Sequence, residues 1–111
     1  MTTQDVIEKI GLKPLSKFEH REISGVFVSD MLSDVMAGAK SGNLWVTVQT
    51  HKSVVPAANL VDVSAVIVTS GKSVPQETVD LATKHNIAIL ATDLPSFELI
   101  GKLYGLGLVS S

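Results

Sequence analysis

Apolar residues along this chain follow two spacings that alternate with one another. Four runs of five or six mostly apolar residues predict strands, and their nearly continuous apolar character is typical of a sheet buried on both faces. The segments after these runs place apolar residues every three or four positions, which predicts helices with one buried face. The predicted strands cover residues 23–28, 44–49, 65–69 and 87–91, and the helices begin near residues 30, 54, 75 and 93.

The strand–helix order, repeated four times, sets the expected architecture. Strands that alternate with helices of this length form right-handed βαβ units, so the strands lie parallel and helices cover both faces. We therefore expect one three-layer α/β/α domain over residues 1–111, with a mostly parallel sheet. Two elements precede the series: a helix over residues 3–10 that stops at Gly11, and an edge strand over residues 12–15, where Pro14 excludes a central position.

Two helices carry specific expectations about their caps and buried faces. Ser29 or Asp30 is expected to cap the helix near residue 30, and Asp93 the last helix, because short polar side chains accept from free N–H groups at helix starts. The apolar spacing predicts which residues face the core. These are Leu32, Val35, Met36 and Ala39 in the first of the two helices, and Phe97, Ile100, Leu103 and Tyr104 in the last.

Composition narrows the class of protein. The 111 residues are 45% hydrophobic, which excludes intrinsic disorder and is enough for one core. The chain has no cysteine, so disulfide scaffolds, cysteine-based zinc sites and thiol nucleophiles are excluded. The net charge of −2 and the pI of about 5.8 give no electrostatic basis for binding nucleic acid.

The low content of charged residues suggests that some apolar residues are buried outside the core, in a subunit interface. Charged residues make up 18% of the chain and the mean hydropathy is +0.33, while ordinary domains carry roughly 25% charged residues. A homodimer would bury the surplus apolar residues, and a sheet buried on both faces is the alternative explanation. No apolar run reaches the length of a membrane span and no signal peptide is evident, so we expect a cytoplasmic protein without a membrane partner.

The loops after the parallel strands are the place to look for a ligand. Open sheets of this kind bind ligands beyond the carboxyl ends of their strands. The candidate ligand-binding residues in these loops are Asp30, Gln49, Thr50, His51, Thr69, Ser70, Gly71, Lys72, Thr92 and Asp93. In this hypothesis Lys72 and the backbone N–H groups of residues 69–71 hold an anion. Residues 49–51 shape the other side, and Asp30 and Asp93 contact a sugar or another polar edge.

The sequence Ser70-Gly71-Lys72-Ser73 resembles the end of a phosphate-binding P-loop. That loop needs a further glycine five residues before Gly71, where this chain has Val66 inside a predicted strand, so the phosphate-wrapping turn cannot form. A simpler anion site at a helix N-terminus stays open, with Lys72 adding a charge. An ordinary strand-to-helix turn with a solvated lysine is the competing interpretation.

No arrangement of residues points to catalysis or to a metal. The three histidines are far apart and have no ligand spacing, and no serine lies in a nucleophile-elbow context. Asp30, Asp34 and His51 could support phosphotransfer or hydrolysis. Acidic residues are also common at helix starts simply because the partial positive charge of the helix N-terminus stabilises them. We therefore predict no catalytic residue, no metal and no cofactor.

Several short motifs, in order, resemble one family over residues 45–97. A strand is followed by Gln49-Thr50-His51 and the alanine pair Ala57-Ala58; a buried strand then ends in Thr69-Ser70-Gly71, followed by Pro75 and by Phe97 in the last helix. This pattern resembles the DRTGG domain, a small regulatory α/β module, although its Asp and Arg stand here as Thr50 and His51. Residues 21–25 and Ser29-Asp30 are similar to the N-terminal domain of the kinase/phosphorylase that acts on the phosphocarrier HPr.

The resemblance implies regulation rather than chemistry. DRTGG domains accompany nucleotide-binding CBS domains in some pyrophosphatases, and the HPr kinase domain that they resemble has no active site. We therefore expect a non-catalytic regulatory module that binds a small phosphorylated or nucleotide ligand and acts as a dimer. The alternative is an interaction module that dimerises or docks on a partner enzyme without any ligand.

Overall fold

Five strands form one sheet in the order β1-β5-β4-β3-β2 in the computed structural model, which describes residues 1–111. Strands β2 to β5 are parallel, and β1 runs antiparallel to β5 at one edge. The strands are β1 (Lys13–Pro14), β2 (Gly25–Val28), β3 (Asn43–Thr47), β4 (Ala65–Val68) and β5 (Ile89–Ala91). The helices are α1 (Thr3–Ile10), α2 (Leu32–Gly38), α3 (Val54–Val61), α4 (Gln76–Lys84) and α5 (Ser96–Gly105).

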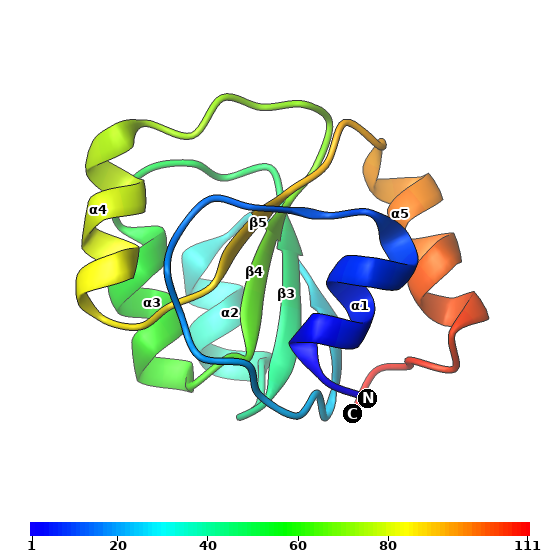
Figure 1. Ribbon diagram of the computed structural model, residues 1–111. Coiled ribbons are helices and arrows are strands. Elements are labelled where there is room, and N and C mark those ends of the chain that lie inside the picture. Colours follow the sequence, from blue (N-terminus) through cyan, green and yellow to red (C-terminus); the bar gives the residue numbers. More distant parts are fainter.

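Alternating side chains along the central strands build two separate cores. Trp45 of β3 and Val66 of β4 lie in one buried cluster with residues of α2, α3 and α4. Leu44 of β3 and Ile67 of β4 point the other way, into a second cluster with residues of α1 and α5. Figure 1 shows the two helical layers on opposite sides of the sheet. The predicted three-layer α/β/α fold with a mostly parallel sheet is thereby confirmed.

The N-terminal helix and the edge strand follow the predicted pattern closely. The side chain of Thr2 accepts from the N–H of Asp5 and the Asp5 carboxylate accepts from the N–H of Thr2, which forms a capping box. These hydrogen bonds to Thr2 lower the pKa of Asp5. Gly11 ends α1 with φ +82°, and the chain then turns into β1, where Lys13 pairs with Ala91. No helix is both long and apolar enough to cross a membrane.

The opposite edge of the sheet is partly covered by the C-terminal segment. The N–H of Val26 in β2 donates to the carbonyl of Val109 at 3.0 Å. A Cβ at Gly25 would lie only 2.8 Å from the side chain of Ser111 and 2.9 Å from that same carbonyl. Glycine at position 25 therefore lets the last residues pass close along the edge strand, which protects an otherwise open row of backbone groups.

The predicted caps and part of the predicted inward faces are wrong. Met31 and Pro95 occupy the cap positions of α2 and α5, and neither makes a side-chain cap bond. Neither Ser29 nor Asp30 therefore caps α2, and Asp93 does not cap α5. Met36 is 49% exposed, Phe97 85% and Tyr104 70%. In α5 the face that reaches the sheet is set by Leu99 and Leu103, which are fully buried. The spacing correctly predicted a helix. More than one of its faces carries apolar residues, however, and only packing against the sheet decides which face is buried.

Candidate functional site

The topology opens a crevice at the carboxyl ends of two neighbouring strands. The chain leaves β4 toward α4 on one face of the sheet and leaves β5 toward α5 on the other face, so the two loops diverge. Diverging loops of this kind form the usual ligand-binding crevice of open parallel sheets. A cavity of about 720 Å³ lies there, within the range of roughly 300–1,000 Å³ that is typical of small-molecule sites.

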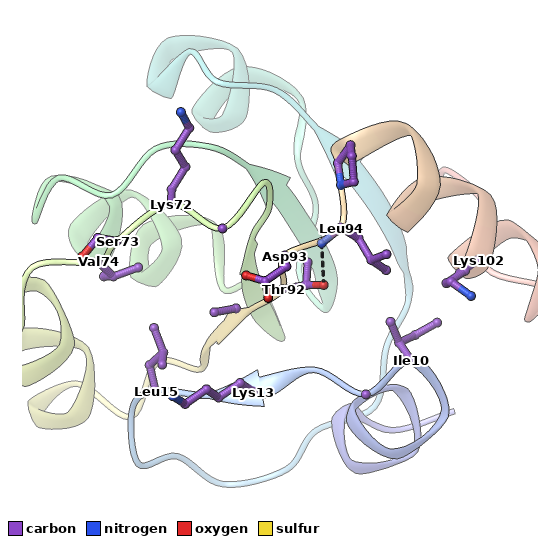
Figure 2. A pocket seen from close by; sticks show the side chains of 14 residues that line it. Ile10, Lys13, Leu15, Lys72, Ser73, Val74, Thr92, Asp93, Leu94 and Lys102 are labelled. Carbon is purple, nitrogen blue, oxygen red and sulfur yellow. Dashed lines mark hydrogen bonds between the residues drawn. The ribbon is translucent and has the colours of Figure 1, made fainter.

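Three segments and one residue of α5 line this cavity, and Figure 2 shows their side chains. Residues 71–74 come from the loop after β4, and residues 91–95 come from the end of β5 and the loop that follows it. The third wall is formed by Ile10, Gly11, Lys13 and Leu15, which the antiparallel pairing of β1 with β5 brings beside Ala91. Lys102 of α5 closes the remaining side. Aliphatic side chains thus line a cavity whose charged groups come from different elements.

The charge of the cavity is opposite to the charge of the whole chain. Lys13, Lys72 and Lys102 are exposed around it, and none of them forms a salt bridge. Figure 2 shows these lysines on three different sides of the opening. Asp93 is the one carboxylate among the lining residues. An excess of unpaired lysines attracts an anion, and the apolar wall gives contact area to the rest of a ligand.

Hydrogen bonds between the two diverging loops fix the floor of the cavity. The N–H of Ser70 donates to the carbonyl of Leu94 at 2.8 Å, and the N–H of Gly71 donates to that of Thr92 at 3.0 Å. Gly71 has φ +65°, and a Cβ there would lie 3.1 Å from Asp93 Oδ1. The Oγ1 of Thr92 accepts from the N–H of Leu94 at 3.1 Å. The β4 and β5 loops therefore form one bonded unit, with glycine where they approach most closely.

This bonding corrects the expected anion cradle. The N–H of Thr69 donates to the carbonyl of Thr47, and that of Lys72 donates to the carbonyl of Thr69, so all four N–H groups of residues 69–72 have partners within the chain. Helix α4 begins only at Gln76. These N–H groups are therefore neither unpaired nor at a helix N-terminus, and the positively charged groups that line the cavity are lysine side chains.

Asp30 and Gln49 belong to a neighbouring loop pair that holds itself together. Asp30 Oδ1 accepts from Thr47 Oγ1 and from the N–H of Val48, both at 2.9 Å. Gln49 Nε2 donates to the backbone carbonyl of Asp30 at 2.9 Å. These bonds tie the loop after β2 to the end of β3. Neither residue lines the cavity.

His51 and Thr50 also make local contacts outside the cavity. The Nδ1 of His51 accepts from the N–H of Ser53 at 3.1 Å and lies 2.9 Å from its Oγ, just before α3 begins. The carbonyl of Thr50 accepts from the hydroxyl of Thr78 in α4 at 2.8 Å. Thr69 is buried and its hydroxyl pairs with that of Ser96 at 2.7 Å. Of the ten candidate residues, the cavity contains Gly71, Lys72, Thr92 and Asp93.

Sequence reasoning missed ten of the fourteen residues that line the cavity. Lys13 and Leu15 belong to the predicted edge strand, but no sequence signal fixes which strand end that edge pairs with. Lys102 sits on α5, where the predicted buried face was wrong at Phe97 and Tyr104. No group of three or more His, Cys, Asp or Glu side chains is placed to hold a metal ion. Chemically, lysines beside aliphatic side chains suit an anion that carries an apolar part.

Comparison with known proteins yields the fold. No protein-family model matches the chain, and no curated protein matches it. Among solved structures it is similar to the CBS and DRTGG domains of the regulatory region of a pyrophosphatase from Clostridium perfringens, with a TM-score of 0.70 and 18% identity. The match covers 91% of this chain and 45% of that one, so this chain spans less than half of that region. The fold is therefore DRTGG-like, and membership of the family stays a prediction.

Proposed function

We propose that this chain is a non-catalytic regulatory domain that binds a small phosphorylated ligand or nucleotide in the cavity between β4 and β5. The single observation that carries the proposal is the set of unpaired lysines, Lys13, Lys72 and Lys102, around an otherwise partly aliphatic cavity. A phosphate-bearing group suits the lysines. A ribose or another polyol suits Asp93, whose carboxylate accepts from hydroxyl groups.

The structural neighbour supports the same proposal from a different direction. That neighbour is the regulatory part of a pyrophosphatase, and its structure was solved in complex with an activator, diadenosine tetraphosphate. A nucleotide ligand, and a partner enzyme whose activity follows ligand binding, are therefore the first choices to test for this chain. The proposal includes the cytoplasm as its location, where nucleotides of this kind are dissolved, and a homodimer as its working form.

The absence of catalysis is part of the proposal and rests on how the candidate groups are engaged. Asp30 accepts two hydrogen bonds from the end of β3. The Nδ1 of His51 accepts from the N–H of Ser53, and Asp34 lies 3.5 Å from the hydroxyl of Ser29. Each group has a local structural partner outside the cavity. A hydrolase or phosphotransferase would need such groups to converge on one reacting atom.

The alternative function is an interaction module that has no ligand. The observation that favours it is the exposure of Phe97 and Tyr104 on the outward face of α5, because large exposed aromatic residues are typical of docking surfaces. Here the lysines around the cavity would be solvated surface groups. The two functions differ in one respect that can be measured, namely whether the folded chain gains stability from small anions.

A thermal-shift experiment tests the proposed function. The probes are ATP, diadenosine tetraphosphate, a cyclic dinucleotide, a sugar phosphate and inorganic pyrophosphate, each with and without magnesium. A probe present at about 100 times its Kd adds roughly 2.7 kcal/mol to the stability, which raises the Tm of a small domain by several degrees. We expect such a shift for at least one probe, and expect Lys72→Ala and Lys102→Ala to reduce it.

The matched control is Lys17→Ala, since Lys17 is an exposed lysine without a salt bridge that lies outside the cavity. This variant should keep the full shift. If every probe leaves the Tm unchanged, the ligand-binding function is wrong and the interaction module takes its place. If Lys17→Ala reduces the shift as much as Lys72→Ala does, the anions bind by overall charge rather than in this cavity.

A further inference from the structure

The outward face of α5 carries aromatic residues that the fold leaves uncovered. Leu99 and Leu103 point into the core, and Phe97 and Tyr104 lie on the opposite side of the helix with 85% and 70% of their surface exposed. The chain has only five aromatic residues, three Phe, one Trp and one Tyr, so two of them lie on this one face. A helix with apolar residues on two opposite sides exposes one apolar surface to water, which is energetically unfavourable.

Gly101, in the interior of α5, has no explanation within the chain, and Gly105 is the last residue of the same helix. Gly101 and Gly105 are exposed, neither has a positive φ, and a Cβ at either position would meet nothing within 4 Å. Glycine in a helix interior is less stable than alanine, so an open position that needs no glycine is expected to carry another residue. Phe97, Gly101 and Gly105 are spaced four apart and share one face. The helix thus presents a ring beside a flat, narrow surface onto which another backbone could pack closely.

This surface is complementary to itself. We propose that α5 pairs with α5 of a second copy of the chain in an antiparallel arrangement centred on Gly101. Phe97 and Gly105 lie four residues before and four residues after that centre, so the ring of Phe97 from each copy packs on Gly105 of the other. The inference rests on the homodimer within the proposed function and assigns the surface that forms it.

The charges beside this face select a second copy over an unrelated partner. Glu98 and Lys102 follow one another by one helical turn on the same flank, and neither forms a salt bridge within the chain. In an antiparallel pair the same flanks of the two helices face each other with their directions reversed. With Gly101 at the centre, Glu98 of each copy lies opposite residue 104 of the other, and Lys102 is two residues away, about 3 Å along the axis, within reach of its long side chain. One sequence thus gives two complementary pairs.

The size of the face sets the expected strength of association. Stable interfaces bury about 800 Å² per partner, more than one ten-residue helix offers by itself. We therefore expect a reversible dimer with a Kd in the micromolar range, one that forms and dissociates with concentration. Lys102 lies between this face and the cavity, so a dimer would alter the charge environment at one side of the ligand site.

Sedimentation velocity of the full chain over a wide concentration range tests the surface. The wild type should shift from monomer to dimer, and Phe97→Ala should weaken the dimer at least about tenfold, as truncation of an aromatic hot spot does. The matched control is Leu60→Ala, because Leu60 is 74% exposed on α3 and lies outside the proposed face. This control should dimerise like the wild type.

Gly101→Ala separates a dimer contact from a structural role. Alanine raises the helical propensity of α5 and meets no neighbour, so the Tm of the diluted monomer should rise, while the close approach of the two helices is lost and the dimer weakens. Glu98→Lys and Lys102→Glu should each weaken association, and the two together should restore it. Restoration by the double variant is specific to a Glu98–Lys102 pair across the interface.

The outcomes distinguish the surface from the proposed function. If the wild type dimerises and Phe97→Ala and Gly101→Ala leave the dimer intact, the chain is a homodimer through another surface and the assignment to α5 is wrong. If the wild type stays monomeric at every concentration, the homodimer itself is wrong and the α5 pairing is overturned with it. Ligand binding in the cavity is tested separately by the thermal shift of the diluted chain, and neither result decides that test.

Discussion

Asp93 Oδ1 lies 3.1 Å from the position that a Cβ on Gly71 would occupy, and this approach joins the two loops that form the floor of the cavity. Gly71 also has φ +65°, a conformation that residues with a side chain adopt at a cost. Backbone bonds from Ser70 and Gly71 to the loop after β5 hold the same two segments together. The shape of the cavity floor thus depends on Gly71, a residue that has no side chain.

Gly71→Ala is expected to destabilise the domain by about 1–3 kcal/mol, because the added methyl group requires both the strained φ and a displacement of Asp93. Urea unfolding followed by circular dichroism measures the change. Gly105→Ala is the control, since that glycine is helical with open space around it and the same substitution there should stabilise the monomer. Equal effects of the two variants would contradict the role given to Gly71.

The lysines around the cavity should act through their charge. For any anionic probe that binds, Lys72→Ala and Lys13→Ala are each expected to weaken binding by about 1 kcal/mol, roughly fivefold, since both side chains are exposed. Isothermal titration calorimetry at low and high salt measures the loss. The wild-type affinity should fall as salt rises, and it should fall less steeply in each variant. A salt dependence that the variants leave unchanged would mean that these lysines do not contact the anion.

Asp62 connects the N-terminal loop to the turn before β4. Hydrogen bonds from Ser41 and then from Arg21 lower the pKa of Asp62, and Arg21 also donates to the carbonyl of Val63 at 2.9 Å. A carboxyl group with a lowered pKa in the folded state stabilises the fold above its unfolded pKa, near 3.8, and that contribution disappears as the pH falls through the folded pKa. The contribution of Asp5 to stability depends on pH in the same direction, because its pKa is also lowered.

Asp62→Asn is therefore expected to reduce the free energy of unfolding at pH 7 by about 0.5–1 kcal/mol, a modest value because the pair is substantially exposed to solvent. The difference from the wild type should narrow below pH 3.8 and nearly vanish in strong acid. Asparagine also tolerates the positive φ of 67° at this position, so the comparison isolates the charge. Urea unfolding at several pH values provides the test, and a difference that stays constant with pH would contradict it.

Trp45 reports on the folded core directly. It is fully buried in β3, and its Nε1 donates to the carbonyl of Ser29 at 2.8 Å. As the only tryptophan in the chain, it should give a blue-shifted emission that moves to longer wavelength on unfolding. Trp45→Phe should cost about 1–3 kcal/mol, because the smaller ring leaves a void and an unpaired carbonyl. Emission typical of a solvated indole in the native protein would contradict the packing of this layer.

The sequence was sufficient to predict the helices and strands and the order in which they follow one another. Continuous apolar runs such as residues 65–68 predicted buried strands because both faces of the sheet are covered, and the Gly11 stop and the position of α3 were also read correctly. The inward face of α5 was predicted only in part. Leu103 is buried and Ile100 is partly buried as expected, but Phe97 and Tyr104 are exposed, and Leu99 is buried although it was not predicted. Local spacing cannot show which stripe reaches the sheet.

The residues of the candidate site could be predicted only in part, because local sequence does not show how the loops pack together. The rule that ligands bind at the carboxyl ends of strands led to Lys72 and Asp93, which do line the cavity. It led equally to Gln49 and His51, because nothing local distinguishes a loop that closes on itself from one that borders an open crevice. Lys13 comes from the antiparallel edge strand, and its place opposite Ala91 depends on a long-range register.

The central claim is that anions bind between the β4 and β5 loops, and an NMR titration of the amide resonances tests it most directly. ATP, diadenosine tetraphosphate and inorganic pyrophosphate are added in turn to the isotope-labelled chain. We predict saturable shifts concentrated at residues 71–74 and 91–94, with smaller changes at Lys13 and Lys102. Shifts centred on residues 49–53 would place the site on the neighbouring loops, and no saturable shift with any of the three probes would contradict the claim.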